Sequence, residues 1–229
     1  MAQTLPLFVE LKSVLLLQSE PEPEFASLEE FDPLRIVKLL EREDENVGII
    51  VATDKNYLGG HPGWINLIKT NTSFPVIRQD FFIDPVQVYQ SKAIGADGVM
   101  INLNFTGSKK LSDLLYAGDE MGLELFLEID DLKLPSKLEF DLLTGIIVNF
   151  QKEPSNHIEN LKKFCLSIPE YVKKLIRFFP HSKQEFTSLK SAGFQALVLS
   201  DEIWQRKNFI EEFNIIANWG SEIGADKQL

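Results

Sequence analysis

The sequence predicts a closed (β/α)8 barrel that forms one domain over residues 1–229. Short apolar runs, each long enough for a buried strand, alternate with amphipathic stretches along the chain. Several of the eight runs are apolar almost throughout, which is typical of parallel strands covered on both faces. The length of 229 residues is also close to the roughly 250 residues of a typical barrel.

The elements follow in order from these patterns. Asp32-Pro33 and Asp84-Pro85 each place an N-cap aspartate before a proline at the first helical position, and the second of these helices ends at Gly95. The last two helices are expected at 183–192 and 207–219, whereas 130–139 is short and contains Pro135, so the fifth helix should be vestigial. The strands are expected at 7–11, 47–52, 75–77, 98–103, 123–129, 145–149, 174–179 and 196–199.

An open, doubly wound sheet is the alternative architecture for such an alternation of strands and helices. No Gly-x-Gly-x-x-Gly follows the first expected strand, and no Gly-x-x-x-x-Gly-Lys-[Ser/Thr] loop occurs. These absences favour the closed barrel, in which chemistry sits where the strands end.

The amino-acid composition limits the classes of binding partner and the cellular compartment that we expect. A net charge of −11 and a pI near 4.8 argue against nucleic acid and against an anionic membrane surface. The single cysteine, Cys165, excludes an intramolecular disulfide and a Cys-rich zinc site, and His61, His157 and His181 lack metal-ligand spacing. From the cysteine count and the histidine spacing we expect no metal site. No apolar run is long enough to span a bilayer, so we expect a cytoplasmic protein.

Polar residues at the expected strand ends are the candidate site. Glu10 and Lys12 end the first strand and face the same way, because they are two residues apart. Glu128 ends the fifth strand, and Asn149 with Gln151 ends the sixth. Such a group could bind a small polar ligand or transfer protons, but from spacing alone we favour a structural polar layer or ion-pair network inside the barrel.

Two segments resemble motifs of the indole-3-glycerol-phosphate synthase family. They are Thr-Asp-Lys-Asn-Tyr-Leu-Gly-Gly at 53–60 and Pro-Val-Ile-Arg-Gln-Asp-Phe-Phe-Ile-Asp at 75–84. The similarity continues at 93–99, 122–129 and 168–169, and so follows the strand order along nearly the whole chain. Only the helical extension that precedes the barrel in this family is expected to be lacking.

The resemblance implies a reaction and its residues. The family closes an indole ring on a phosphorylated carboxyphenylamino-deoxyribulose with loss of carbon dioxide and water, and it uses no cofactor. By resemblance, Glu10 and Lys12 are the first-strand Glu-x-Lys of the family, Glu128 is its acid–base glutamate and Asn149 is its sixth-strand asparagine.

The same site contains departures from the family pattern. Gln79 stands where the family has its general-acid lysine, and an amide cannot deliver a proton that is typically worth about 10²–10⁴ in rate. Gln151 replaces an arginine that would hold an anionic substrate, and Val-Leu-Leu at 14–16 replaces a Ser-Pro-Ser loop.

The phosphate site departs further. Arg177-Phe178-Phe179 replaces Glu-Ser-Gly after the seventh strand, and Ser200-Asp201 replaces Gly-Ser or Gly-Thr after the eighth. Backbone amides must approach phosphate closely, so bulky rings and an added carboxylate predict that phosphate does not bind there.

Three functions remain open from the sequence. The chain could have lost family catalysis and serve as a binding or interaction protein, with a mouth capped by the apolar residues 14–17, and we favour this hypothesis. It could instead be an active synthase, or it could act on a non-phosphorylated ligand through Glu10, Lys12 and Glu128. We further expect Lys12 to lie within hydrogen-bonding reach of both carboxylates, so that Lys12→Met would destabilise the fold.

Overall fold

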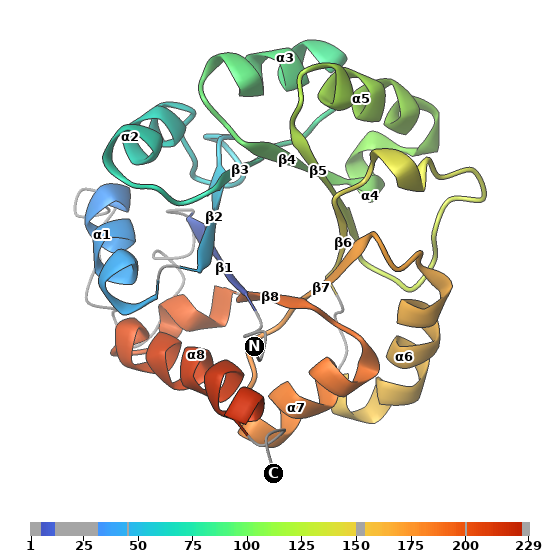
Figure 1. Cartoon of the computed structure of the whole chain (residues 1–229). Coiled ribbons are helices and arrows are strands. Elements are labelled where there is room, and N and C mark those ends of the chain that lie inside the picture. The colour runs from blue at the N-terminus through green and yellow to red at the C-terminus, as the bar shows by residue number, and fades with distance from the viewer. Residues whose placement is uncertain (1–5, 12–31, 45, 150–153, 200, 226–229) are drawn as a thin grey trace.

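The computed structural model describes residues 6–11, 32–44, 46–149, 154–199 and 201–225. Within these ranges, parallel strands β1 to β8 pair in chain order and β1 pairs with β8, which closes the barrel (Figure 1). The predicted fold class is therefore confirmed. The strands are β1 (Leu7–Leu11), β2 (Val47–Ala52), β3 (Val76–Gln79), β4 (Gly98–Asn102), β5 (Glu124–Ile129), β6 (Gly145–Val148), β7 (Lys173–Arg177) and β8 (Ala196–Leu199).

Helices surround the barrel as an outer layer (Figure 1). They are α1 (Pro33–Glu43), α2 (Gly63–Asn71), α3 (Pro85–Ala93), α4 (Leu103–Thr106), α5 (Ser108–Glu120), α6 (Ile158–Ser167), α7 (Lys183–Ala192) and α8 (Phe209–Ala225). The described residues also form the short 3-10 turns η2 (Phe140–Leu142), η3 (Pro154–His157) and η4 (Asp201–Gln205). None of the helices in the described ranges is both long and apolar enough to cross a membrane.

The helix starts follow the predicted capping chemistry. The Asp32 carboxylate accepts hydrogen bonds from the backbone N–H groups of Leu34 and Arg35, at 3.0 and 3.1 Å. Asp84 accepts from Val86 N–H, and the Gln87 side chain accepts from Asp84 N–H, which completes a capping box. Between β5 and β6 the chain forms only the turn η2, so the expectation of a vestigial fifth helix is confirmed.

Two strand ends differ by two residues from the sequence prediction, whereas the ends of β4 and β6 differ by one. β7 ends at Arg177 and not at residue 179, because the chain leaves the sheet after the backbone N–H of Phe178 bonds to Val198 C=O. β3 runs on to Gln79, beyond the predicted end at residue 77. Both shifts matter for the site, because they make Arg177 and Gln79 the last residues of their strands.

Side chains alternate between the inside and the outside of the barrel, as the two-residue period of a strand requires. The middle of the barrel is filled by an apolar layer, which is contributed by Phe8, Ile50, Ile77, Met100, Phe126, Ile147, Leu175 and Val198. Two residues further along their strands, the inward positions of β1, β3, β4, β5 and β7 are polar. A polar layer therefore lies directly above the apolar one, at the carboxyl ends of the strands.

Gly48 sets the fit between β1 and β2. It pairs in register with Phe8, and a Cβ built on Gly48 would lie 2.3 Å from carbon atoms of the Phe8 ring. The glycine thus leaves the space that the ring occupies inside the barrel.

Candidate functional site

Three charged side chains meet inside the barrel at the carboxyl ends of β1, β5 and β7. Glu10 and Glu128 are 1% and 4% exposed, respectively, and Arg177 lies between them. The Arg177 guanidinium donates from Nη1 to Glu10 Oε2, and from Nε and Nη2 to Glu128 Oε1 at 3.0 and 2.7 Å. One permanently charged guanidinium is therefore paired with both buried carboxylates.

The second oxygen of Glu128 is also engaged. Asn102, at the end of β4, donates from Nδ2 to Glu128 Oε2 at 2.9 Å. Met100 Sδ lies 3.7 Å from Arg177 Nη2. Both oxygens of this carboxylate thus accept hydrogen bonds from neighbouring side chains, which leaves few lone pairs for taking a proton from a ligand.

The backbone at Glu10 is held by a residue 194 positions later in the sequence. Trp204 in η4 donates from its indole Nε1 to the Glu10 carbonyl at 3.1 Å, and the ring is buried. This bond joins the end of β1 to the segment after β8, so the carboxylate of Glu10 is carried on a rigid strand.

Gln79 is the inward residue at the end of β3. Its carbonyl accepts from Thr53 N–H at 2.9 Å, which holds the strand end. Its side-chain Oε1 is buried and accepts no hydrogen bond from the described part of the chain. An open acceptor therefore stands where the family resemblance places a lysine donor.

Arg78 points the opposite way and belongs to the packing of α3. It donates to Thr53 Oγ1 at 2.8 Å and to Ser91 Oγ at 3.1 Å, and it pairs with Asp80 at 2.6 Å. Its guanidinium also bonds to the Gln87 carbonyl at 3.0 Å. This cation ties β3 to α3 and does not face the barrel interior.

Asn149 follows β6 and bonds to the neighbouring loop. Its Nδ2 donates to Asp130 Oδ1 at 3.1 Å, and Asn104 Nδ2 donates to the other oxygen of Asp130. Asn149 thus anchors the loop that follows β5. Lys12 and Gln151 lie outside the described residues, so the placement of Lys12 between the two carboxylates stays a prediction.

Arg177 was assigned to the phosphate loop from the sequence, and that assignment is wrong. The residue ends β7 and faces inward, like Leu175 two positions earlier. The signal that could have found it is this two-residue period, which puts residues 173, 175 and 177 on one face. The cation seen between Glu10 and Glu128 is therefore an arginine that the sequence analysis did not count among the site residues.

Aromatic side chains occupy the loop that follows β7. Phe179 is 2% exposed, the Arg206 guanidinium stacks 4.7 Å above its ring, and the His181 ring lies 5.6 Å away. Arg206 also pairs with Glu202 at 2.6 Å. The space near β7 is thus filled by a packed ring and a neutralised ion pair. Ser200 and the side chain of Asp201 lie outside the described residues.

Cys165 lies away from this site, on α6. Burial raises the pKa of its thiol from 9.0 to about 11, although nearby Lys174 acts in the opposite direction. The same burial lowers the pKa of Lys174, whose ammonium bonds to the Pro169 carbonyl at 2.9 Å. Both groups belong to packing around α6 and the start of β7.

Solved structures of other proteins share this fold. Orotidine 5'-phosphate decarboxylase from Pyrococcus horikoshii OT3 is 16% identical, with a TM-score of 0.63, and the match covers 93% of this chain and 99% of that one. KGPDC from Streptococcus mutans is 11% identical, with a TM-score of 0.66, and the match covers 96% and 99% of the two chains. At these identities the likeness concerns the barrel alone.

Sequence relatives identify the family more specifically than the solved structures do. Indole-3-glycerol phosphate synthase of Thermoanaerobacter sp. (strain X514) is 28% identical over 203 residues, covering 80% of this chain and 74% of the relative. The synthase of Geobacillus sp. (strain WCH70) is 30% identical over 193 residues, covering 80% and 71%. The family model for indole-3-glycerol phosphate synthase matches residues 24–142, just over half of the chain. The chain therefore belongs to the indole-3-glycerol phosphate synthase family.

Proposed function

We propose that this member of the family does not catalyse indole ring closure and serves instead as a binding or interaction protein. The observation that carries the proposal is the pairing of Arg177 with both Glu10 and Glu128. In the family resemblance these two glutamates belong to the catalytic site. Here they are two members of a buried ion-pair cluster with Arg177.

The chemistry of the cluster supports this proposal. Ring closure with loss of water needs a group that gives a proton and a group that takes one. Arg177 does not release a proton at neutral pH, and Gln79 has no acidic proton to give. Glu128 accepts hydrogen bonds at both oxygens, so a proton transfer to it would have to break contacts with Arg177 or Asn102.

The surroundings of β7 support it as well. A phosphorylated substrate would need backbone amides open to its phosphate, which small residues provide. Phe179 is buried there under the Arg206 guanidinium, and Arg206 is already paired with Glu202. The described residues thus offer no free cation next to the ring.

Two other functions have support of their own. Retained synthase activity is supported by the relatives of 26–30% identity that carry that name. A reaction on a non-phosphorylated ligand is supported by the open acceptor of Gln79, which a ligand N–H or O–H could satisfy. Genetic complementation distinguishes retained synthase activity from our proposal.

The test is complementation of a tryptophan auxotroph that lacks indole-3-glycerol phosphate synthase. We expect the gene for this chain to leave the strain unable to grow without tryptophan, while the gene of the Geobacillus relative restores growth from the same promoter. An immunoblot of soluble extract confirms that both proteins accumulate. Growth supported by this chain would contradict the proposal and would favour an active synthase.

A further inference from the structure

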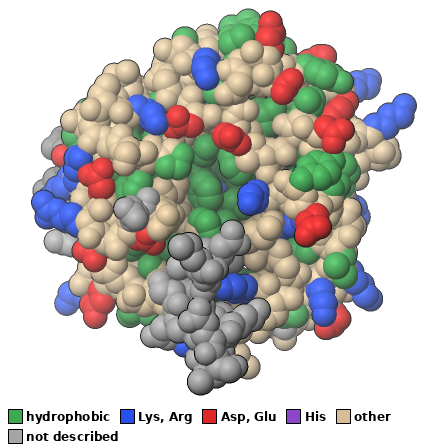
Figure 2. All heavy atoms as spheres, viewed as in Figure 1, with side chains coloured by type: hydrophobic (Ala, Val, Ile, Leu, Met, Phe, Trp, Pro, Cys, Tyr) green, Lys and Arg blue, Asp and Glu red, His purple; other side chains and the backbone are tan. Residues whose placement is uncertain are grey.

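A cavity lies at the end of the barrel opposite the Arg177 cluster, where the strands begin. Its volume is about 580 Å³, within the roughly 300–1,000 Å³ of small-molecule sites. Figure 2 views the molecule from this end and shows a hollow lined by hydrophobic side chains at the centre, with both basic and acidic side chains at its border. It is separated from the Arg177 cluster by the apolar layer of the barrel.

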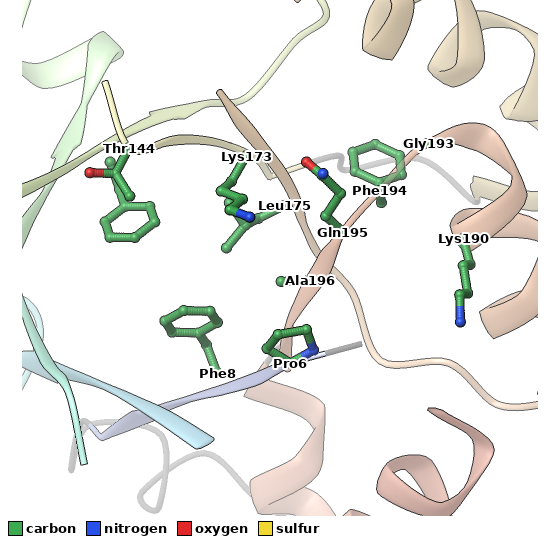
Figure 3. A pocket seen from close by; sticks show the side chains of 11 residues that line it. Pro6, Phe8, Thr144, Lys173, Leu175, Lys190, Gly193, Phe194, Gln195 and Ala196 are labelled. Atoms are coloured by element: carbon green, nitrogen blue, oxygen red, sulfur yellow. The ribbon is translucent and has the colours of Figure 1, made fainter. Parts of the chain in front are cut away.

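The floor of the cavity is apolar and comes from four strands. Phe8 and Phe126 meet edge to face, with ring centroids 6.1 Å apart. Leu175 and Ala196 complete the surface and, with Phe8, are labelled in Figure 3. Phe194, which follows α7, closes one side.

The inward positions at the start of three strands are small. These positions are Gly98 on β4, Gly145 on β6 and Ala196 on β8. A Cβ on Gly98 or Gly145 would come within 2.9 Å of Ile77 or Leu175, so these glycines also let the inner layer close above the cavity. Of these three small residues, Ala196 lines the cavity itself.

The rim carries positive charge. Lys173 begins β7 two residues before Leu175, and Lys190 reaches the rim from α7 (Figure 3). Neither lysine forms an ion pair with a described residue. Thr144 is already committed, because its hydroxyl donates to Glu124 Oε2 at 2.5 Å. The Glu124 carboxylate therefore lies at the same border, where one carboxylate stands against two lysines. The border of the hollow is thus positive in a chain with a net charge of −11.

We propose that this cavity binds a small amphipathic carboxylate. The apolar body of the ligand lies on Phe8, Phe126 and Leu175, and its carboxylate pairs with Lys173 at the rim. Charge complementarity selects the anion, because an ammonium head would face Lys173 and Lys190 and an uncharged head would leave them without a partner. This site does not depend on whether the other end of the barrel is catalytic.

The binding test uses the full chain and isothermal titration calorimetry with hexanoate, octanoate and decanoate. We expect one site per chain and an affinity that rises up to about fourfold for each added methylene, the value for a fully buried group. Octylammonium should bind at least tenfold more weakly than octanoate. Equal affinity for the two octyl ligands, or no saturable binding of decanoate, would overturn the proposal.

Variants localise the binding. Lys173→Glu should weaken decanoate binding at least tenfold, whereas Lys163→Glu, at an exposed position of α6 that does not line the cavity, should leave it unchanged. Ala196→Leu should abolish binding by filling the hollow, and circular dichroism checks that the variant folds. Wild-type affinity in Lys173→Glu would contradict the site. Binding that appears only after residues 1–5 are removed would assign the cavity to the chain's own N-terminus and overturn the proposal.

Discussion

Arg177 is the residue on which the interpretation of the site rests. It reaches Glu10, which lies 167 positions away in the sequence, and Glu128, which lies 49 positions away. Sequence alone identified both glutamates, because they end apolar strands and match a family motif. It missed the arginine, because which cation meets a buried carboxylate depends on the exact strand end and on closure of the barrel.

Replacing Arg177 should destabilise the protein strongly. Arg177→Gln would leave two buried carboxylates without this cation, and removing one partner of a buried pair typically costs about 3–5 kcal/mol. Urea unfolding followed by circular dichroism measures the change. The control is Arg206→Gln, which breaks a partly exposed pair with Glu202 and should cost at most about 1 kcal/mol. Equal midpoints for Arg177→Gln and the wild type would contradict the structural role of the cluster.

The buried thiol of Cys165 makes stability depend on alkaline pH. Its pKa rises from 9.0 in the unfolded chain to about 11 in the fold because burial disfavours the thiolate. The unfolded state therefore loses its proton first, and the free energy of unfolding should fall as pH rises from 9.0 to about 11. Urea titrations at several pH values should show a shallower decline for Cys165→Ala. Parallel declines for the two proteins would rule out this contribution.

At the scale of elements, patterns within short segments predicted the fold well. The two Asp-Pro helix starts, the lack of an α-helix between β5 and β6, and the bounds of β1, β2 and β8 follow from capping and apolar runs, which are local properties. The ends of β3 and β7 were placed wrongly, because a strand stops where its neighbours stop offering backbone partners. That information is not present in a single run of residues.

The fit of Phe8 over Gly48 gives a test at this scale. Gly48→Ala would place a methyl group 2.3 Å from the Phe8 ring, and such overpacking typically costs about 1–3 kcal/mol. Phe8→Leu in the same chain should recover part of the loss, because it removes the clashing ring atoms. A double-mutant cycle from chemical unfolding measures the coupling. Additive effects of the two substitutions would show that the contact is not the cause.

The loop after β7 predicts weak anion binding. Phe179 fills the space beside the strand end, and the Arg206 guanidinium above it is paired with Glu202. Inorganic phosphate and sulfate should therefore show no saturable binding at millimolar concentration by calorimetry. Saturable binding of phosphate or sulfate at millimolar concentration, lost in Arg206→Gln, would contradict this prediction.

For the whole molecule, barrel and family were readable from the sequence because strand order, length and motifs survive divergence. The activity was not, because a family fold carries different chemistry when the residues at its strand ends change. The two ends of this barrel now have distinct characters: a buried ion-pair cluster where the strands end and an open apolar hollow with lysines where they begin.

The most direct measurement is steady-state turnover of the family substrate, the phosphorylated carboxyphenylamino-deoxyribulose, by the purified chain at neutral pH. Product is followed by indole fluorescence, with the Geobacillus relative as the positive control. Arg177 pairs with both Glu10 and Glu128, and Gln79 stands where the family has its general-acid lysine. We therefore expect no rate above the protein-free background. A turnover number in the ordinary enzymatic range of about 1–10³ s⁻¹ would contradict the account.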